Sequence, residues 1–455
     1  MSSTKPTAAS PATLPAVQLS GALKDAWPSD VTPTHEYVAA VEHMRDGQGH
    51  LFVTGRAGTG KSTLLRTLRD MATEDIVVVA PTGLAAVNVG GQTIHSFFGL
   101  PPRMVRGEDI RRSRNGRIMR KLKHLVIDEV SMVRSDLMWA IDQSLRINRG
   151  KPREPFGGVR LMMFGDLHQL PPVVQDDVAG HLEDQFGGPF FFSVPALMEG
   201  DGTTLLELNQ VFRQSEGPLL QVLNKVREGN VDIDDLGVLN ERVAPIRTLS
   251  EGEAFVILTP TNAAAQRINL AYLTALKGAA FSYTAGMTGE FNPSAQPTDQ
   301  TLTLKAGAKV IMLRNDADGR WVNGSIARIA RLAEKQVFIL IDGREYEVEP
   351  ASWENRRYAY DQGEQKIVET VAGTFTQYPV RLAWAMTIHK SQGMTLDNVY
   401  LDLGRGTFAH GQAYVALSRC RTLEGLTLAR PLQPRDIIFD VSAMGYRNVF
   451  HHLSP

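Results

Sequence analysis

The stretch from Leu51 to Arg69 limits what this chain can fold into more than any other segment does. An apolar run, His50 to Thr54, is followed by a glycine-rich turn and then by leucines at helical spacing, which predicts a strand, a loop and a helix. Gly55, Gly58 and Gly60 allow the loop to turn tightly, so that backbone N–H groups and the start of the helix can face a polyphosphate. The sequence therefore predicts a phosphate-binding loop.

Side chains in and after this loop supply the other groups that phosphoryl transfer needs. Lys61 can reach the β- and γ-phosphates of a nucleotide, and the Ser62 hydroxyl can bind Mg²⁺. Asp128 and Glu129 end a later apolar run, where the first can hold Mg²⁺ through water and the second can activate the attacking water. The block GDLHQLPPV places Gln169 at the same edge, although alone it would be read as a proline-fixed loop.

The alternation of apolar runs with longer segments predicts the sheet that carries these groups. Ile76 to Ala80, Leu125 to Asp128 and Val159 to Phe164 are β-branched-rich runs separated by enough chain for crossover helices. A helix is expected before the first strand, over THEYVAAVEHM after Pro33. We therefore expect a parallel sheet covered on both faces, with the phosphate loop at the carboxyl end of its strand.

Composition sets the outer limits of the interpretation. The chain has 455 residues, of which 43% are hydrophobic, enough for roughly two to four domains. Its net charge of −1 gives no global attraction to nucleic acid, so such binding would need a local groove. No membrane-length apolar run or signal peptide is visible, and Cys420 is the only cysteine. These features favour a reducing, cytoplasmic location, in a bacterial-type cytosol or at the nucleoid, and argue against disulfides.

Taken together, the sequence blocks resemble those of superfamily-one helicases of the 5′→3′ branch, most closely the Pif-type DNA helicases, with RecD and Dda as related proteins. The resemblance extends from about Pro33 to Arg430. It rests on an ordered series: GRAGTGKST, APTGLAA, GQTIHSFFGL, VIDEVSM, FGGVRLMMFGDLHQLPPV, LNQVFRQ, VILTPTNAAAQRIN, WAMTIHKSQGMTL and GQAYVALSRCR. It implies an α/β fold of two RecA-like P-loop motor domains with parallel sheets, and ATP and Mg²⁺ as cofactors.

The resemblance also implies roles for individual residues. It makes Gln169 the sensor that links the γ-phosphate to DNA, and Arg213 and Arg419 the arginine fingers of the second motor domain. Relatives usually read adenine with a glutamine before the first strand, and the nearest position here is Tyr37, which departs from that pattern. The implied nucleotide-binding set is Gly55, Ala57, Gly58, Thr59, Gly60, Lys61, Ser62, Thr63, Tyr37 and Gln412.

A second implied set contacts single-stranded DNA through hydroxyls, backbone amides and stacking rings. It comprises Pro81, Thr82, Gly83, Ala85, His95, Phe97, Thr259, His389, Lys390, Ser391, Gln392 and Gly393. Phe97 has two interpretations, because Phe98 follows it and one of two adjacent rings usually points into the core. The partners expected are single-stranded DNA and forked or tailed duplex DNA, with no membrane and with protein partners left open.

Two insertions are expected between the motor segments. Residues 103–123 carry nine basic side chains against Glu108 and Asp109, and match in position a small hairpin that relatives place at the DNA fork. A solvated face is the alternative. Residues 285–378 contain short strand-like runs separated by turns, as in the family's Src-homology-type β-barrel. Its Trp321, Trp353, Tyr358 and Tyr360 either line the barrel or, more in keeping with their size, fill its core.

These expectations divide the chain into domains. The division is a mobile tail over 1–30 with a transit peptide as the alternative, a first motor domain over 31–198, a second over 199–284 and 379–440, the barrel over 285–378, and a C-terminal tail over 441–455. The function expected is 5′→3′ DNA unwinding driven by ATP hydrolysis. A RecD-like motor subunit of a nuclease or repair assembly, and a single-strand-binding remodeller without unwinding activity, are the alternatives.

Overall fold

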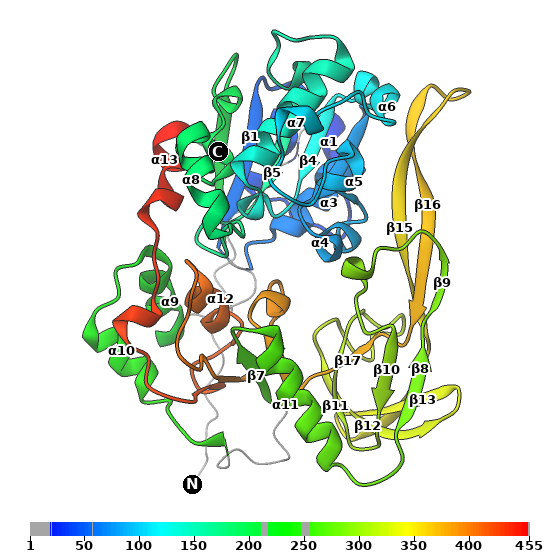
Figure 1. Ribbon diagram of the computed structural model, residues 1–455, viewed down its shortest axis with the longest axis vertical. Coiled ribbons are helices and arrows are strands. Elements are labelled where there is room, and N and C mark those ends of the chain that lie inside the picture. The colour runs from blue at the N-terminus through cyan, green and yellow to red at the C-terminus, as the bar shows by residue number, and fades with distance from the viewer. Residues whose placement is uncertain (1–18, 20, 57, 211–216, 247–254, 454–455) are drawn as a thin grey trace.

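The computed structural model describes residues 19, 21–56, 58–210, 217–246 and 255–453. Two α/β motor domains lie one above the other, and an inserted all-β domain lies beside the lower one (Figure 1). Ala57 and Arg213, which the sequence assigned to the nucleotide site, lie outside the described residues.

The first motor domain is built on a seven-stranded parallel sheet in the order β21-β6-β1-β5-β4-β2-β3. The predicted runs all form strands of this sheet. Its strands are β1 (His50–Gly55), β2 (Ile76–Ala80), β3 (Gln92–Thr93), β4 (His124–Ile127), β5 (Arg160–Phe164), β6 (Thr203–Leu208) and β21 (His451–His452). Its helices are α1 (Gly21–Ala26), α2 (His35–Asp46), α3 (Lys61–Met71), α4 (Gly83–Asn88), α5 (Ile94–Phe98), α6 (Gly116–Lys121), α7 (Ser135–Arg149), α8 (Asp176–Phe186) and α13 (Tyr446–Val449).

Both faces of this sheet are buried, as the continuous apolar runs predicted. Leu51 and Val53 of β1 pack with residues of α2 and α3, whereas Phe52 between them packs on the opposite face with α5 and α7. Successive side chains of a strand point to opposite faces, so each central strand contributes to two separate cores. The phosphate loop then emerges at the carboxyl end of β1, held in place by both layers.

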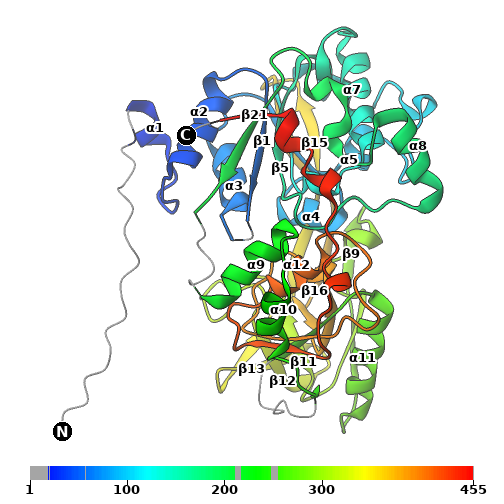
Figure 2. The ribbon, with the colours of Figure 1, turned by 90° about the vertical axis from the view of Figure 1, so that its left-hand side faces the viewer.

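Three parts of this domain differ from the expected boundaries. β6 was assigned to the second domain, but it pairs in parallel with β1. The C-terminal segment is not a tail, because β21 pairs with β6, and Tyr446 and Phe450 enter the first core (Figure 2). Residues 21–30 are not a free tail either, since Leu23 is buried beside α2 and α3 and Trp27 packs against the same core. Each of these three segments carries apolar side chains that pack on the first motor domain. The local sequence pattern predicts a strand but does not reveal which sheet the strand joins.

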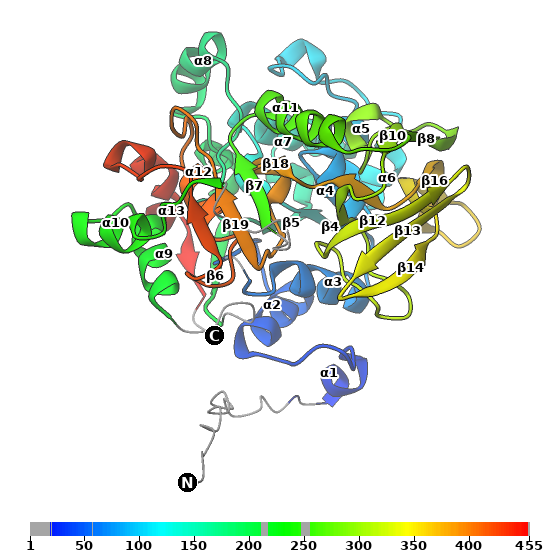
Figure 3. The same cartoon turned by 90° about the horizontal axis from the view of Figure 1, so that it is seen from below.

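The second motor domain contains a four-stranded parallel sheet in the order β18-β7-β19-β20. Its strands are β7 (Phe255–Thr259), β18 (Ala385–Thr387), β19 (Asn398–Leu401) and β20 (Leu426–Leu428), and its helices are α9 (Pro218–Glu228), α10 (Ile233–Asn240), α11 (Asn262–Ala275) and α12 (Gln412–Leu417). Val256 and Leu258 face α9, α10 and α12, whereas Ile257 faces α11, so this sheet too is covered on both sides (Figure 3).

The inserted domain is a compact set of antiparallel strands around one core. It contains β8 (Phe281–Thr284), β10 (Thr301–Leu304), β11 (Lys309–Met312), β12 (Ile326–Ala333), β13 (Gln336–Ile341), β14 (Arg344–Val348) and β17 (Val380–Leu382). A two-stranded and a five-stranded sheet share a core that includes Trp321, Ile339 and Val380. The domain therefore extends slightly beyond both expected limits, and its assignment as a Src-homology-type barrel stays a prediction.

A long hairpin leaves the inserted domain and reaches the first motor domain. It consists of β15 (Ala351–Asp361) and β16 (Lys366–Gln377), with β9 (Gly286–Gly289) along its base (Figure 1). Tyr358 of β15 lies in the core of the first motor domain, where its hydroxyl accepts a hydrogen bond from the Val78 N–H at 2.9 Å. Trp321 is buried in the core of the inserted domain, as the second interpretation predicted. Trp353 is buried against Phe375, and both tryptophans also line a cavity beside that domain.

The basic segment 103–123 is not a hairpin of paired strands. It forms a 3-10 turn over Gly107–Asp109 and the short helix α6, joined by extended chain. Strand pairing needs alternating apolar side chains to cover one face, and the run from Arg111 to Arg114 has none. Instead, Arg117 of α6 lies over the ring of Tyr360 from the long hairpin, with its guanidinium carbon 4.7 Å from the ring centre.

Candidate active site

The loop between β1 and α3 has the geometry of a phosphate cradle. Gly58 and Gly60 have φ of 85° and 82°, which only glycine adopts freely. A Cβ on Gly55 would lie 2.7 Å from the Thr59 hydroxyl and 2.8 Å from the Leu208 carbonyl oxygen. These three positions therefore exclude side chains, and backbone amides are left to line the space in front of α3.

Lys61 is the cation of this cradle. Its ammonium donates hydrogen bonds to the Gly55 carbonyl at 2.6 Å and to the Arg56 carbonyl at 3.0 Å. Burial lowers its pKa, while the carboxylates of Asp166 and Glu129 act in the opposite direction. The structure therefore holds the Lys61 ammonium against the loop in which a polyphosphate would lie, and a hydrogen-bonded lysine fits that ligand.

Asp128 and Glu129 follow β4 and form a pair of half-buried carboxyl groups. Burial raises the pKa of Asp128 to about 6, and burial together with Asp128 raises that of Glu129 to about 7. Glu129 has a left-handed backbone with φ of 49°, an uncommon conformation for a residue with a side chain. A carboxyl group poised near neutral pH suits a general base, and the Asp128 carboxylate with the Ser62 hydroxyl offers the oxygen ligands that Mg²⁺ prefers.

A cleft of about 510 Å³ lies between the two motor domains, and residues of the phosphate loop and Glu129 line it. Its wall contains most of the predicted nucleotide-binding set and part of the predicted catalytic set. From the first come Tyr37, Gly58, Thr59, Gly60, Lys61, Ser62 and Thr63, and from the second Glu129, Gln169 and Arg419. The cleft is also lined by Asp30, Val31 and Thr32, of which Asp30 is the last residue of the segment 1–30 that was expected to be a mobile tail. Gln412 is not in its wall. That side chain is fully buried at the start of α12, where its carbonyl oxygen accepts from the Phe408 N–H at 3.0 Å.

Tyr37 occupies the end of the cleft where the sequence placed the adenine-reading position. Its hydroxyl donates to the Gly60 carbonyl at 2.8 Å, and burial raises its pKa to about 12. Tyr37 is only 3% exposed, so its side chain packs between α2 and the loop and supports the loop. The tyrosine is thus tied to the phosphate loop.

Arg419 enters the same cleft from the second motor domain. It is 1% exposed, and its guanidinium donates to the Val415 carbonyl at 2.9 Å and to the Met394 carbonyl at 3.1 Å. Its charge reaches Glu129, whose pKa it lowers. The predicted finger therefore lies at the nucleotide cleft, and in this arrangement it also supports the loop after Gln392.

Gln392 was assigned to DNA binding, but its amide lies at the nucleotide cleft. It donates toward Glu129 Oε2 at 3.3 Å and Gln169 Oε1 at 3.2 Å. The Gln169 amide in turn donates to Asp166 Oδ2 at 2.9 Å. The Gln392 amide of the second motor domain thus contacts the predicted base, and it also contacts Gln169 of the first.

Sequence reasoning missed two charged residues behind this cleft. Asp166 is 1% exposed and Arg227, from α9, is 3% exposed, and they face each other across the domain boundary at 3.7 Å. Asp166 lies in the quoted block around Gln169, so its position was visible there, whereas nothing in the pattern of α9 distinguishes Arg227 from a surface arginine.

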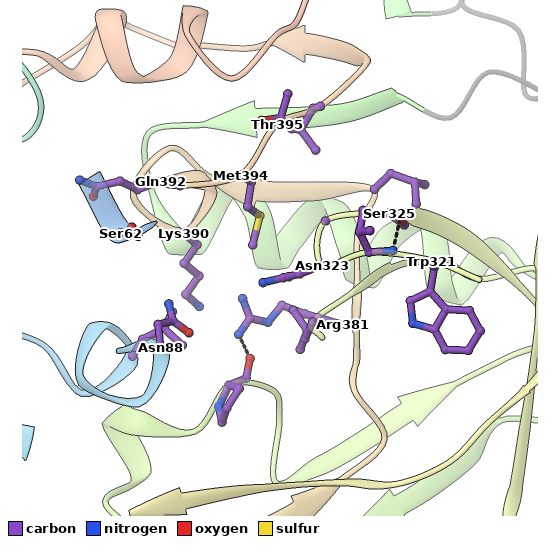
Figure 4. Close-up of a pocket in the computed structure, with 18 of the residues that line it drawn as sticks. Ser62, Asn88, Trp321, Asn323, Ser325, Arg381, Lys390, Gln392, Met394 and Thr395 are labelled. Atoms are coloured by element: carbon purple, nitrogen blue, oxygen red, sulfur yellow. Dashed lines mark hydrogen bonds between the residues drawn. The ribbon is translucent and has the colours of Figure 1, made fainter. Parts of the chain in front are cut away.

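A second crevice, of about 990 Å³, lies between the motor domains and the inserted domain. Of the residues assigned to DNA, Thr82, Ala85, His389, Lys390 and Gln392 line it. An adjoining cavity of about 940 Å³ also contains Gly393 in its wall. Figure 4 shows the side chains of Lys390, Asn88 and Arg381 pointing into this cavity, from one domain each. The crevice is therefore shared by three domains, and its wall places Arg381 and Lys390 beside the carboxyl groups of Asp299 and Glu129.

Other residues assigned to DNA do not line either space. Phe97 is fully buried against Phe98 and Tyr358, so the core interpretation is correct and it presents no ring for stacking. Ser391 is also buried, and its hydroxyl donates to the Ile388 carbonyl at 2.8 Å. A Cβ on Gly83 would lie 2.6 Å from that of Ala295 in the inserted domain. Pro81, His95 and Thr259 lie outside the walls of the crevice as well.

No helix among the described residues is long and apolar enough to cross a membrane. The Cys420 thiol is buried, and burial raises its pKa to about 11. A thiol with this pKa stays protonated and unreactive at neutral pH.

Comparisons with known proteins agree with this geometry. The family model of PIF1-like helicases matches residues 34–228. The ATP-dependent DNA helicase Pif1 of Bdellovibrio bacteriovorus is 34% identical over 431 residues, which are 92% of each chain. The unliganded Pif1 of a Bacteroides species is 36% identical, with a TM-score of 0.84 over 92% of this chain and 97% of that one.

The arrangement of the domains can also be compared. Bacteroides Pif1 bound to single-stranded DNA covers the same shares of both chains at 35% identity, but its TM-score is 0.65. The present arrangement therefore resembles the unliganded relative more than the DNA-bound one. On its sequence, fold and site, this chain belongs to the family of Pif1-like helicases.

Proposed function

We propose that this chain is an ATP-dependent DNA helicase that moves 5′→3′ along single-stranded DNA and separates duplexes by Mg²⁺-dependent ATP hydrolysis. The observation that carries the proposal is the nucleotide cleft. The phosphate loop and Glu129 of one motor domain line this cleft together with Arg419 and Gln392 of the other, and Asp128 lines the adjoining cavity with Ser62 and Glu129.

The residues of the cleft divide the chemistry among them. Lys61 and the loop amides hold the negative phosphate oxygens, and Ser62 with Asp128 would hold Mg²⁺, which offsets charge on the β- and γ-phosphates. Glu129 accepts the proton of the attacking water, and its pKa near 7 leaves it partly ionised at neutral pH. Arg419 supplies positive charge to the transferring phosphoryl group, a contribution worth about 10³ to 10⁵ in rate.

The DNA-binding part of the proposal rests on the crevice shared by three domains. Lys390 and Arg381 can bind backbone phosphates, and the Thr82 hydroxyl and His389 ring line the same space. Opening one base-pair step requires about 1.4 kcal/mol of stacking energy on average. A single aromatic–base stack is worth a similar amount, so modest rearrangements of the crevice in each ATP cycle suffice for unwinding.

Unwinding of tailed duplexes by the isolated chain tests the proposal. A duplex with a 5′ single-stranded tail should be unwound with ATP and Mg²⁺, and one with only a 3′ tail should not. Equal or reversed activity would remove the direction. Strong ATPase activity without unwinding would favour a remodeller or a motor subunit of a larger assembly. A cytoplasmic location at the nucleoid is also part of the proposal, supported by the single buried cysteine.

A further inference from the structure

Arg227 is a buried cation for which the hydrolysis mechanism above has no role. It lies in the last turn of α9, in the second motor domain, and its side chain faces the first. Its Nη2 lies 3.7 Å from Asp166 Oδ1 and 3.7 Å from Glu207 Oε1. Among the described residues, neither Nε nor Nη2 of Arg227 has a hydrogen-bond acceptor. A guanidinium that is removed from water and incompletely hydrogen-bonded is costly, so its position calls for an explanation.

The backbone of Arg227 is fastened to the same loop of the first domain. Its carbonyl oxygen lies 2.7 Å from the ring nitrogen Nδ1 of His168, and the backbone N–H of His168 donates to Asp166 Oδ1 at 3.1 Å. The end of α9 is thus held to this loop by its main chain as well as by charge. A shift of α9 relative to the first domain would disturb both contacts together.

From Asp166 a line of hydrogen bonds runs to the predicted base. Asp166 accepts from the Gln169 amide at 2.9 Å, and the Gln392 amide donates to Gln169 at 3.2 Å and to Glu129 at 3.3 Å. Burial alone would raise the pKa of Asp166, but the charges of Arg227 and Lys61 outweigh it and hold that pKa at about 2. Asp166 therefore stays an ionised acceptor, which fixes the orientation of the Gln169 amide.

Arg227 itself does not line the nucleotide cleft. It contacts Asp166, which contacts Gln169, and Gln169 is the residue of this series that lines the cleft. It therefore does not act as a finger on the phosphates. Asp166 and Gln169 belong to the first motor domain, and Arg227 and Gln392 to the second. The line is consequently complete only while the two domains are in contact.

We propose that Arg227 is a positioning residue that couples the placement of the second motor domain to the base Glu129, through Asp166, Gln169 and Gln392. The inference rests on the proposed ATPase function. DNA that spans both motor domains would change the contact of α9 with the first domain, and with it the hydrogen bond on the Glu129 carboxylate.

ATPase assays on the full chain, with and without single-stranded DNA, test this role. Arg227→Gln should reduce the stimulation of kcat by DNA about tenfold, while DNA-free turnover changes less than threefold. Arg227→Lys, which keeps the charge, should recover at least a third of the stimulation. The matched control is Lys225→Gln, two residues earlier on the same helix, where the ammonium pairs with Asp232 and Asp235 at the surface. It should keep wild-type stimulation.

A double-mutant cycle separates coupling from a structural role. If the four residues act as one line, Arg227→Gln combined with Gln392→Ala should lose no more stimulation than the worse single variant. Multiplicative losses would overturn the proposal. Equal losses of DNA-free and stimulated turnover, without rescue by lysine, would also overturn it and make Arg227 structural.

Two further comparisons keep the test decisive. Should Arg227→Gln fold poorly, the pair Asp166→Asn with Arg227→Gln removes both buried charges, and it should restore the melting temperature while stimulation stays low. Restored stimulation in this pair would contradict the proposal. If the wild-type chain showed no ATPase activity at all, the proposed function would fail, and that result is distinct from a loss confined to the Arg227 variants.

Discussion

The nucleotide cleft and the DNA crevice lie side by side, yet they are built in opposite ways. In the cleft, Arg419 is buried and Lys61 and Glu129 are half-buried, and all three are tied to backbone carbonyls or to neighbouring amides. In the crevice, Lys390 is exposed and Thr82 stands at the start of α4. Hydrolysis requires charge that is already oriented in a water-poor site, whereas a polymer can be held by many contacts of modest strength. Single substitutions should therefore have large effects in the cleft and small effects in the crevice.

The largest effect is expected at Arg419. Arg419→Ala should lower the DNA-stimulated kcat by about 10³-fold or more, roughly 4 kcal/mol of lost transition-state stabilisation, because a charge next to the phosphoryl group is removed. Steady-state ATPase assays measure the loss. DNA affinity without nucleotide, measured by fluorescence anisotropy, should stay near wild type.

The hydrogen bonds of Arg419 to Val415 and Met394 make a control necessary. Lys61→Ala should impair ATP binding as well as turnover, in contrast to Arg419→Ala. If Arg419→Ala kept most of its stimulated kcat, or lost DNA binding in the absence of nucleotide, the residue would be structural and the cleft would lose its finger.

Glu129 should give the next largest effect. Glu129→Gln keeps the size of the side chain and removes the proton acceptor, so kcat should fall by about 10² to 10⁴-fold while ATP binding persists. Equilibrium binding of a fluorescent ATP analogue, beside single-turnover hydrolysis, separates the two. Retention of turnover by Glu129→Gln would mean that another group activates the water.

A smaller effect is expected in the crevice. Lys390→Ala should weaken single-strand binding by about tenfold, roughly 1.4 kcal/mol, and reduce the salt dependence of binding by about one unit of slope. Titrations at several salt concentrations measure both. Lys277→Ala, an exposed lysine just after α11, is the control and should leave them unchanged. A loss of 10³-fold or more at Lys390 would show that the crevice depends on single residues, as the cleft does.

The two sites also differ in how far the sequence could predict them. The phosphate loop and the Asp128–Glu129 pair were predicted because a few adjacent residues fix their geometry. Gln392 was assigned to DNA and lines the crevice, but its contact with Glu129 in the nucleotide cleft was not predicted, because sequence order does not tell that one side chain lies between two sites. The pairing of Asp166 with Arg227 joins two domains across 61 residues, and no local pattern carries that information.

The same limit applies to the architecture. β1, β2, β4 and β5 were predicted from their apolar runs, because a strand buried on both faces must be continuously apolar. The pairing of β6 and β21 with the first sheet was not predicted, since pairing partners are chosen by tertiary packing. The docking of Tyr358 into the first motor domain, 280 residues from Val78, was equally beyond local reasoning.

The smallest effect on ATP turnover is expected from the basic segment 103–123, which the structure divides into parts with different surroundings. Arg103 is neutralised by Asp109 at 2.7 Å, and Arg117 and Lys121 lie over the Tyr360 ring of the long hairpin. Arg112 and Arg114 line a hollow of about 440 Å³ with Arg117, Arg120 and Arg149, and no acidic residue lies in its wall. A hollow lined by arginines and lacking carboxylates favours a polyanion, and duplex DNA at the fork is the polyanion that a helicase meets.

Replacing Arg111, Arg112 and Arg114 by alanine should therefore weaken unwinding of a forked duplex more than it weakens ATPase activity stimulated by single strands. Each phosphate contact that is lost should reduce the slope of log affinity against log salt by about 0.9 on duplex DNA, so a loss of one to three contacts is measurable. Arg103→Ala is the matched control, because Asp109 already neutralises that charge, and its slope should stay at the wild-type value. If the triple variant kept wild-type unwinding and salt slope, the segment would be a solvated face with a structural contact to the hairpin. The long hairpin would then be the better candidate for the element nearest the fork.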